Sequence, residues 1–372
     1  MNDANTNDEL DYTLLEDICK SLYREKNEVE LVAEDEDYVV LNEKRIGKNY
    51  KVIANYENRD LLVKNNPKLK VFEDRGFKFG DYVELLFDYD SMMCNDCDEF
   101  VFSEFEIDDV KINITNPSFL FDVVMNGFSN DKYYDNNYFY TISLKGITEE
   151  NYEDYLTKAL FLIGYYNPSV NDTSYPECYE FLGELYFKYA EDESIIERRR
   201  KDNPSYSDKK FNDIKYPEAL AFYNEGKVLF GHEISFQYFY KVIEHFFLIC
   251  RQDEFRNIIT EYNSRNNINE FIDKVTKIYR QQEDSQLKVL LESIEPDIQA
   301  IVSECKKNGY IIEDSVDAFS DALYLYRNSI VHGKSDDKFV VKTPSSIGLK
   351  QEKFWNLATE QIAEKLIVKY CL

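Results

Sequence analysis

The sequence predicts an α+β protein, in which a β-rich N-terminal domain is followed by an all-α helical bundle. Between residues 29 and 144, short apolar runs alternate with polar residues, a pattern typical of half-buried strands. From residue 211 onward, apolar residues recur at the spacing of amphipathic helices. A polar stretch at 191–210, which contains the turn signal Asn203-Pro204-Ser205, indicates a linker or exposed loop between the two patterns.

We therefore expect three segments along the chain. A β-rich domain covers 1–147, a helical connector and linker cover 148–210, and an α-helical domain covers 211–372. A chain of 372 residues is long enough for two or three domains, each of which can bury its own core.

The elements expected in the N-terminal domain are one short helix at 14–25 and several strands. The alternation is clearest at 100–107 and 110–114, where one face of each strand would be buried. An antiparallel sheet follows from this pattern, because antiparallel strands commonly have one solvated face. The strands are expected at 29–32, 38–41, 50–53, 100–107, 110–114 and 138–144.

Helices are expected over the remainder of the chain. Pro217 suits the first turn of a helix, and Gly309 and Gly333 stand just beyond the ends of two others, where glycine accepts a left-handed backbone. The expected helices cover 148–166, 178–190, 217–230, 232–262 or 234–262, 268–294, 296–308, 315–331 and 350–372.

Composition favours a soluble, cytoplasmic protein with no membrane association. No run of 18 uncharged apolar residues exists, so no transmembrane helix is expected. The polar, acidic N-terminus lacks the basic-then-apolar order of a secretion signal. Seven scattered cysteines fit a reducing compartment better than a disulfide framework.

The charge is strongly negative and uneven. The chain has 44 Lys+Arg against 71 Asp+Glu, a net charge of −27. Residues 211–372 contribute 20 against 25, which leaves 24 against 46, a net charge of −22, for residues 1–210. Such a chain repels a phosphate backbone at long range, which argues against a general RNA- or DNA-coating protein. A nuclease with a small local basic site is still compatible with this charge.

The segment most informative about function is Tyr326-Arg327-Asn328-Ser329-Ile330-Val331-His332-Gly333, at the expected C-terminal end of a helix that Ser315 caps. Arginine offers paired donors to a phosphate, and histidine can move a proton to or from the ribose and leaving-group oxygens. A helix C-terminus favours the protonated imidazole, which suits an acid. Asn328 could orient the histidine or the phosphate. The chain has three histidines in all, which gives this one weight.

The spacing favours a site shared by two copies of the chain. Arg327 and His332 are five residues apart, roughly 140° around a helix axis and about 7.5 Å along it, so they would not point at one small group. A two-fold axis could bring both pairs to a single cleft. The structural alternative is that Arg327 is a surface residue, Asn328 is a solvated helix residue, and His332 only caps the helix.

The phrase from Ala322 to Gly333 resembles the signature of the HEPN superfamily of α-helical ribonucleases, in particular its Apea-like group. The run from Phe236 to Phe246, which ends in Glu-His and then Phe, resembles the first core helix of that group. The resemblance covers about 217–372. It implies a metal-independent endoribonuclease with no cofactor, which acts on RNA as a homodimer and leaves 2′,3′-cyclic phosphate and 5′-hydroxyl ends.

The resemblance also assigns roles to residues and a biological setting. Arg327 and His332 correspond to the catalytic pair, and Asn328 to the polar residue after the arginine. Lys334 could contact a phosphate, although a solvated lysine is the alternative. The setting implied is an antiphage or abortive-infection effector, and the acidic N-terminal domain would then recognise a protein or phage-derived trigger or restrain the nuclease.

Two rival functions remain open at this stage. In one, the helical domain is a noncatalytic, HEPN-like binding or scaffold protein, and Arg327 and His332 only hold a dimer interface. In the other, the acidic N-terminal domain is an interaction module for a basic partner. Weaker motifs are Cys94 and Cys97, half a zinc site without a second half, and Glu244, for which a structural role is expected.

Overall fold

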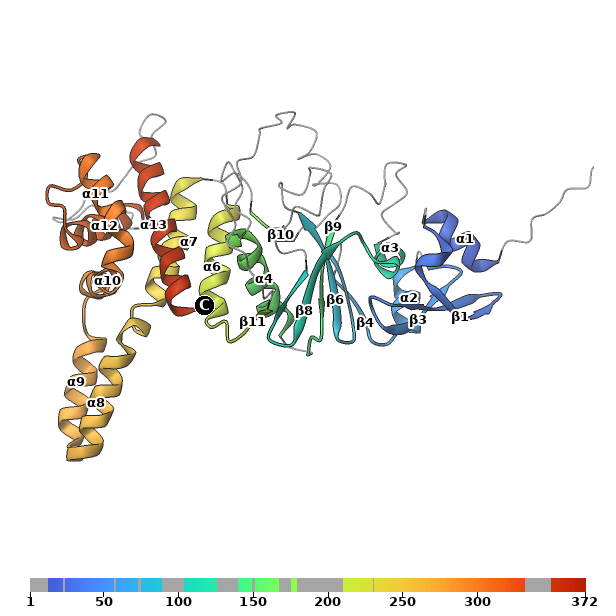
Figure 1. Ribbon diagram of the computed structural model, residues 1–372, viewed down its shortest axis with the longest axis horizontal. Coiled ribbons are helices and arrows are strands. Elements are labelled where there is room, and N and C mark those ends of the chain that lie inside the picture. Colours follow the sequence, from blue (N-terminus) through green and yellow to red (C-terminus); the bar gives the residue numbers. More distant parts are fainter. Residues whose placement is uncertain are drawn as a thin grey trace, which may run out of the picture. The chain divides into compact units, whose positions relative to one another are not determined.

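A computed structural model of the chain confirms the α+β class, with β-sheets in the N-terminal part and an all-helical C-terminal part (Figure 1). The chain divides into two compact units, Met1–Asn212 and Asp213–Leu372. The structure describes residues 13–22, 24–56, 58–72, 75–88, 104–125, 140–148, 151–166, 175–178, 210–229, 231–331 and 349–372.

The first unit contains two sheets. The smaller is antiparallel, with the order β1 (Glu30–Asp35), β2 (Tyr38–Glu43) and β3 (Lys48–Ile53). The larger has eight strands among the described residues, in the order β11-β7-β8-β9-β6-β5-β4 with β10 beside β6. Its pairs are antiparallel except β11 with β7. These strands are β4 (Leu69–Phe72), β5 (Gly76–Phe79), β6 (Tyr82–Asp88), β7 (Glu104–Ile107), β8 (Val110–Thr115), β9 (Tyr140–Lys145), β10 (Glu177–Cys178) and β11 (Lys210–Phe211).

Five of these strands were not predicted from the sequence: β4, β5, β6 and the two-residue strands β10 and β11. Cys178, where a helix was expected to begin, ends β10. Every residue of β6 is buried, so the strand has no alternation between apolar and polar faces that a period-2 pattern could reveal. The spacing of the acidic residues Asp88, Asp90, Asp96 and Asp98 predicts a solvated loop, but Asp88 is buried at the end of β6 and the other three lie outside the described residues. The helix expected over 14–25 is also shorter: α1 ends at Ser21 and a 3-10 turn, Lys26–Glu28, follows.

The helices of the first unit pack on these sheets. They are α1 (Leu14–Ser21), α2 (Arg59–Asn65), α3 (Phe119–Met125) and α4 (Tyr152–Tyr166). All seven residues of α3 are buried, and its apolar side chains join those of α1 and the small sheet in one core. The connector helix expected over 148–166 corresponds to α4, which lies in the first unit with the sheets.

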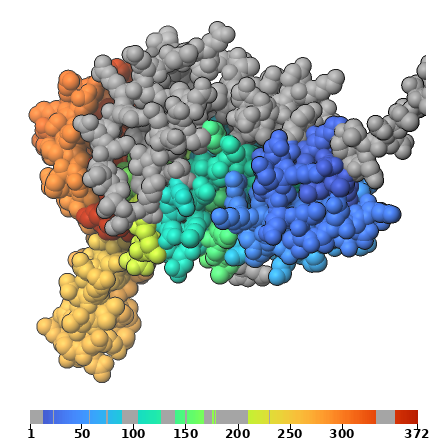
Figure 2. Space-filling view, turned by 45° about the vertical axis from the view of Figure 1, so that its right-hand side comes forward, coloured from blue at the N-terminus to red at the C-terminus, as the bar shows by residue number. Residues whose placement is uncertain are grey.

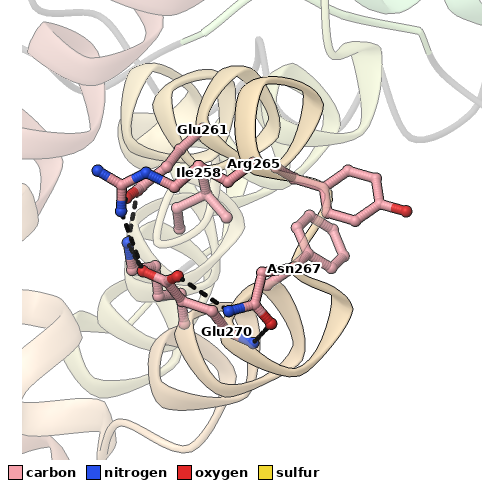
Figure 3. A pocket seen from close by; sticks show the side chains of 8 residues that line it. Ile258, Glu261, Arg265, Asn267 and Glu270 are labelled. Carbon is pink, nitrogen blue, oxygen red and sulfur yellow. Dashed lines mark hydrogen bonds and ion pairs between the residues drawn. The ribbon is translucent and has the colours of Figure 1, made fainter.

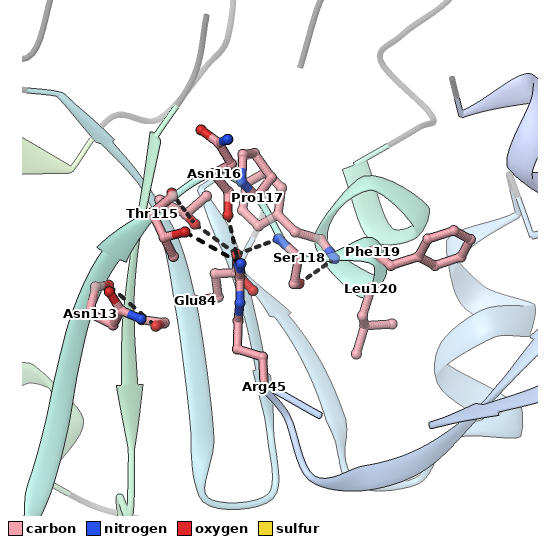
Figure 4. A network of polar contacts seen from close by, with 12 residues as sticks. Arg45, Glu84, Asn113, Thr115, Asn116, Pro117, Ser118, Phe119 and Leu120 are labelled. Carbon is pink, nitrogen blue, oxygen red and sulfur yellow. Dashed lines mark hydrogen bonds and ion pairs between the residues drawn. The ribbon is translucent and has the colours of Figure 1, made fainter. Parts of the chain in front are cut away.

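Two buried carboxylates hold the N-terminus of α3. Glu84 on β6 is fully buried, and its Oε1 accepts a hydrogen bond from the Ser118 amide at 2.8 Å (Figure 4). Glu43 on β2 accepts from the amides of Phe119 at 3.1 Å and Leu120 at 3.3 Å. The first-turn N–H groups of a helix have no partner within the helix, so these carboxylates satisfy them and fix α3 to both sheets.

The second unit is all helical. Its helices are α6 (Pro217–Val228), α7 (His232–His245), α8 (Gln252–Arg265), α9 (Ile268–Tyr279), α10 (Glu283–Glu292), α11 (Glu295–Lys307), α12 (Val316–Val331) and α13 (Leu349–Tyr370). In the bundle, α7 packs between α6 and α13, and α10 and α11 pack on α12.

Two helices that the sequence predicted as continuous are broken. The one expected to run to 262 ends at His245, and a 3-10 turn at Ile249–Arg251 leads into α8. The one expected over 268–294 is interrupted between α9 and α10. Neither break contains Gly or Pro, which are the usual signs of a helix end. The first break, 246–251, is mostly apolar and so continues the apolar pattern, whereas the second is the polar segment Arg280-Gln281-Gln282.

Candidate active site around Arg327

The helix that carries the motif is built as its sequence predicts. The Ser315 hydroxyl accepts a hydrogen bond from the Ala318 amide at 3.2 Å and so caps the N-terminus of α12. On the buried face of α12, the Tyr326 ring stacks on Trp355 of α13, with ring centroids 5.4 Å apart. This packing fixes the rotation of α12 about its axis, and with it the direction in which Arg327 extends.

Arg327 forms ion pairs with carboxylates from two other helices. Its Nη2 donates to Glu244 Oε1 on α7 at 3.0 Å, and its Nε lies 3.4 Å from Glu283 Oε1 on α10. The side chain of Arg327 is 18% exposed, so it is largely withdrawn from water. The alternative of an unconstrained surface arginine is therefore wrong for this side chain.

An aromatic ring completes the surroundings of the guanidinium. The Cζ of Arg327 lies 5.5 Å from the centroid of the buried Tyr240 ring, within the range of a cation–π contact. The Tyr240 hydroxyl donates to Glu283 Oε1 at 3.1 Å, so the same carboxylate oxygen contacts both side chains. Burial, together with the charge of Glu283, raises the pKa of Tyr240, which therefore stays a hydrogen-bond donor at neutral pH.

Asn328 is buried and is the third partner of Arg327. Its Oδ1 accepts a hydrogen bond from Arg327 Nη1 at 3.1 Å, and the residue is 6% exposed. The alternative of a solvated helix residue is thus wrong. Because its amide contacts the guanidinium, Asn328 helps to set the plane in which the donors of Arg327 lie.

The cluster formed by Tyr240, Glu244, Glu283, Arg327 and Asn328, called here the Arg327 cluster, contains more negative than positive charge. Burial raises the pKa of Glu244, and the neighbouring Glu283 raises it further, whereas Arg327 lowers it. The raised pKa means that Glu244 takes up a proton more readily than an exposed glutamate does.

Several residues singled out from the sequence lie outside the described residues. They include His332 and Lys334, which follow α12, and Cys94 and Cys97. Arg327 and Asn328 are therefore placed together by the structure, and their relation to His332 stays a prediction. Within the part of the chain that the structure describes, no three His, Cys, Asp or Glu side chains are grouped as metal ligands.

Two members of the cluster, Tyr240 and Glu283, were not predicted from the sequence, and only a structural role was expected for Glu244. Tyr240 and Glu244 are four residues apart on α7 and therefore share a helix face, which is a usable local signal. Glu283 is 44 positions before Arg327 and belongs to a helix whose start was not predicted, so no local pattern indicated it.

Comparison with known proteins gives no relative to set beside this site. The chain matches none of the known protein families, none of the curated proteins and none of the solved structures. None of the helices in the described ranges combines the length and apolar character needed to cross a membrane.

Proposed function

We propose that the protein is a metal-independent endoribonuclease that acts as a homodimer and leaves 2′,3′-cyclic phosphate and 5′-hydroxyl ends. The observation that supports this most is the placement of Arg327. Two carboxylates, an aromatic ring and Asn328 orient its guanidinium near the C-terminal end of α12. An arginine held this way is preorganised to stabilise the charge that develops on a phosphate during cleavage.

The guanidinium retains capacity for a substrate. It has five N–H donors, and among the described residues its hydrogen-bond and ion-pair partners are Glu244, Glu283 and Asn328. A phosphate that binds Arg327 must compete with these carboxylates. Glu244, whose pKa is raised, is the partner best suited to take up a proton as the phosphate arrives. We therefore assign Glu244 as a positioning residue for Arg327.

The reaction itself requires two proton transfers. The ribose 2′-oxygen attacks phosphorus and loses its proton to a base, while the bond from phosphorus to the 5′-oxygen breaks and that oxygen takes a proton from an acid. We assign these roles to His332 of the two copies that form the cleft. Asn328 orients Arg327, and Lys334 contacts a neighbouring phosphate of the RNA.

Cleavage of total RNA in EDTA tests these assignments. Arg327→Ala and His332→Ala should each abolish cleavage, and Lys334→Ala should weaken RNA binding, whereas Lys307→Ala, at a position on α11 that is 78% exposed, is the control. If the cleft is shared, an excess of His332→Ala protein mixed with the wild type should lower the activity per wild-type molecule, because the mixed dimers keep only one of the two histidines. Cleavage by the His332→Ala protein at the wild-type rate would refute the assignment.

On the same basis we propose a role as an antiphage or abortive-infection effector, in which the first unit recognises a protein or phage-derived trigger. Only the resemblance to defence ribonucleases and the fusion of an acidic domain support this. Expression in bacteria should be toxic for the wild type once triggered and harmless for His332→Ala. If removal of residues 1–212 changes neither toxicity nor its trigger dependence, the regulatory role fails.

A second candidate function, binding of a basic protein segment by the first unit, is favoured by the edge of the small sheet. All six residues of β1 are exposed, and in the described part of the chain no strand pairs with its outer side. The opposite edge is closed, because the Asn66 side chain bonds both the amide and the carbonyl of Lys51 on β3, at 2.8 and 2.7 Å.

The charge of β1 selects the class of partner. Glu30, Glu34 and Asp35 repel a second copy of the same strand and attract a basic one, which could add to the sheet through main-chain hydrogen bonds. An eight-residue peptide of alternating Lys and Val should bind the full-length wild-type protein. A variant with both Glu30→Lys and Asp35→Lys should bind the same peptide at least tenfold more weakly. If the wild type binds no peptide at about 1 mM, a concentration at which even weak complexes form, this function is excluded.

A further inference from the structure

Helices α8 and α9 form an antiparallel hairpin with little core of its own (Figure 1, Figure 2). Across its 14 and 12 residues, only Ile258 and Ile278 are buried. Ring contacts join the two helices, with Phe255 6.0 Å from Tyr279 and Tyr262 5.2 Å from Phe271, so the start of α8 lies beside the end of α9.

One face of the hairpin is polar and internally paired. Arg265 Nη1 lies 2.8 Å from Glu261 Oε1, and Lys274 Nζ lies 3.0 Å from Glu270 Oε1 and also pairs with Glu261. Figure 3 shows Glu261, Arg265 and Glu270 on the same side of the two helices. The ion pairs satisfy this face within the hairpin itself.

The opposite face is apolar and exposed to solvent. Ile259 on α8 is 48% exposed, and Ile268, Ile272 and Tyr279 on α9 are 51%, 51% and 60% exposed. Successive residues are roughly 100° apart around a helix axis, so Ile259 lies roughly 100° from the buried Ile258 around α8. Ile268, Ile272 and Tyr279 lie roughly 100° from the buried Ile278 around α9, in the same rotational sense. Because the helices are antiparallel, both stripes fall on the same face, away from the ion pairs.

The charge of the hairpin identifies the partner that fits this face. Residues 252–280 contain five acidic and five basic residues and are neutral, whereas the whole chain has a net charge of −27. Two copies of a strongly anionic protein repel each other over most of their surface. The neutral hairpin is a region where two copies can approach without that cost and bury apolar area.

We propose that a second copy of the chain docks on the apolar face of the α8–α9 hairpin, and that the four helices form an intermolecular bundle. Fourteen helical residues span about 21 Å, and two adjacent helices are about 20 Å wide, so each copy contributes a face of about 400 Å². The total of about 800 Å² is small for a stable dimer. The association is therefore weak and depends on protein concentration.

This surface deepens the proposed function, on which it rests for the need for a dimer. Along the chain, the hairpin connects the two helices whose carboxylates pair with Arg327. Helix α8 follows α7, which carries Glu244, and α9 precedes α10, which starts at Glu283. A second copy bound to the hairpin also restrains the C-terminal end of α7 and the N-terminal end of α10. Dimerisation then stabilises the arrangement of carboxylates around the arginine.

Sedimentation equilibrium of the full-length protein between about 1 and 100 µM, the range in which small interfaces dissociate, tests the proposal. The wild type should show a monomer–dimer equilibrium that 0.5 M salt does not weaken, because the face is apolar and neutral. Ile268→Glu combined with Ile272→Glu should raise the dissociation constant at least tenfold. Ile312→Glu, at a position that is 93% exposed and outside the hairpin, is the control and should dimerise as the wild type does.

Two results would overturn the proposal: a wild type that stays monomeric throughout, or a dimer that survives Ile268→Glu with Ile272→Glu. Circular dichroism should show that these variants remain folded, because both positions are solvent-exposed. Arg327→Ala protein, run alongside, separates this test from that of the nuclease. If this variant dimerises normally but does not cleave RNA, dimerisation and cleavage are separable. The sedimentation measurement then tests the hairpin interface, and the cleavage assay tests the proposed nuclease function.

Discussion

Replacing Arg327 with methionine removes the cation that Glu244 and Glu283 share and keeps much of the side-chain volume. At an effective dielectric constant of 20, unit charges about 4 Å apart attract by about 4 kcal/mol. The carboxylate side chains are 35% and 28% exposed, so solvent screening reduces each pair to about 1 kcal/mol. The free energy of unfolding of the helical unit should therefore fall by about 2 kcal/mol.

Urea unfolding followed by tryptophan fluorescence measures this change in the helical unit. Trp355 is the single tryptophan of the chain, is buried, and stacks on the residue before Arg327. With a urea dependence of about 2 kcal/mol per molar, the midpoint should fall by about 1 M. Arg256→Met, at a position that is 72% exposed, is the control and should leave the midpoint unchanged.

The free energy of unfolding lost in Arg327→Met should also depend on pH. The pKa of Glu244 is raised in the folded state, chiefly by burial, so this carboxylate becomes neutral at a higher pH than in the unfolded chain. As pH falls through that folded pKa, the arginine has less charge to pair with, and its removal costs less. The Arg327→Met difference should therefore be smaller at pH 5 than at pH 7.5. A variant as stable as the wild type at pH 7.5, or a loss that grows on acidification, would refute the ion-pair account.

Three further predictions concern stability and reactivity elsewhere. Burial raises the pKa of Asp122 to about 7, although Arg24 Nε lies 3.0 Å from its Oδ2 and lowers it. The first unit should therefore lose stability as pH rises from about 4 to about 7, and Asp122→Asn should remove that slope in urea melts. Gly76→Ala should lower the melting temperature far more than Gly309→Ala. The Cβ of an alanine at position 76 would overlap a backbone carbonyl of β6, whereas that of an alanine at position 309 would meet no neighbouring atom. Equal losses in melting temperature would contradict this. Burial raises the pKa of Cys305 and Cys371 to about 12, so both should resist a thiol reagent at pH 8 until urea unfolds the protein, and rapid native labelling would be inconsistent with it.

Local pattern in the sequence was enough for the elements with one buried and one solvated face. The strand β8 alternates between buried and more exposed residues, and α12 has its cap and its apolar stripe at the expected positions. The fully buried β6 and the two helix breaks gave no such pattern. Their geometry depends on what packs around them rather than on their own residues.

The candidate site shows the same division. Arg327 and Asn328 were identified from residue type and position at a helix end, which are local properties. Glu283 and Tyr240 join them only because α10 and α7 pack beside α12, a consequence of tertiary structure. The sequence therefore identified the arginine, while the structure identified what orients it.

The most direct test of the central proposal is the chemistry of the RNA ends. Purified wild-type and His332→Ala proteins are incubated with total RNA and transfer RNA in excess EDTA, and the product ends are mapped. The proposal predicts cleavage by the wild type alone, with 2′,3′-cyclic phosphate and 5′-hydroxyl ends, since the 2′-oxygen is the nucleophile. Products with 5′-phosphate ends, cleavage that EDTA abolishes, or equal cleavage by both proteins would contradict it.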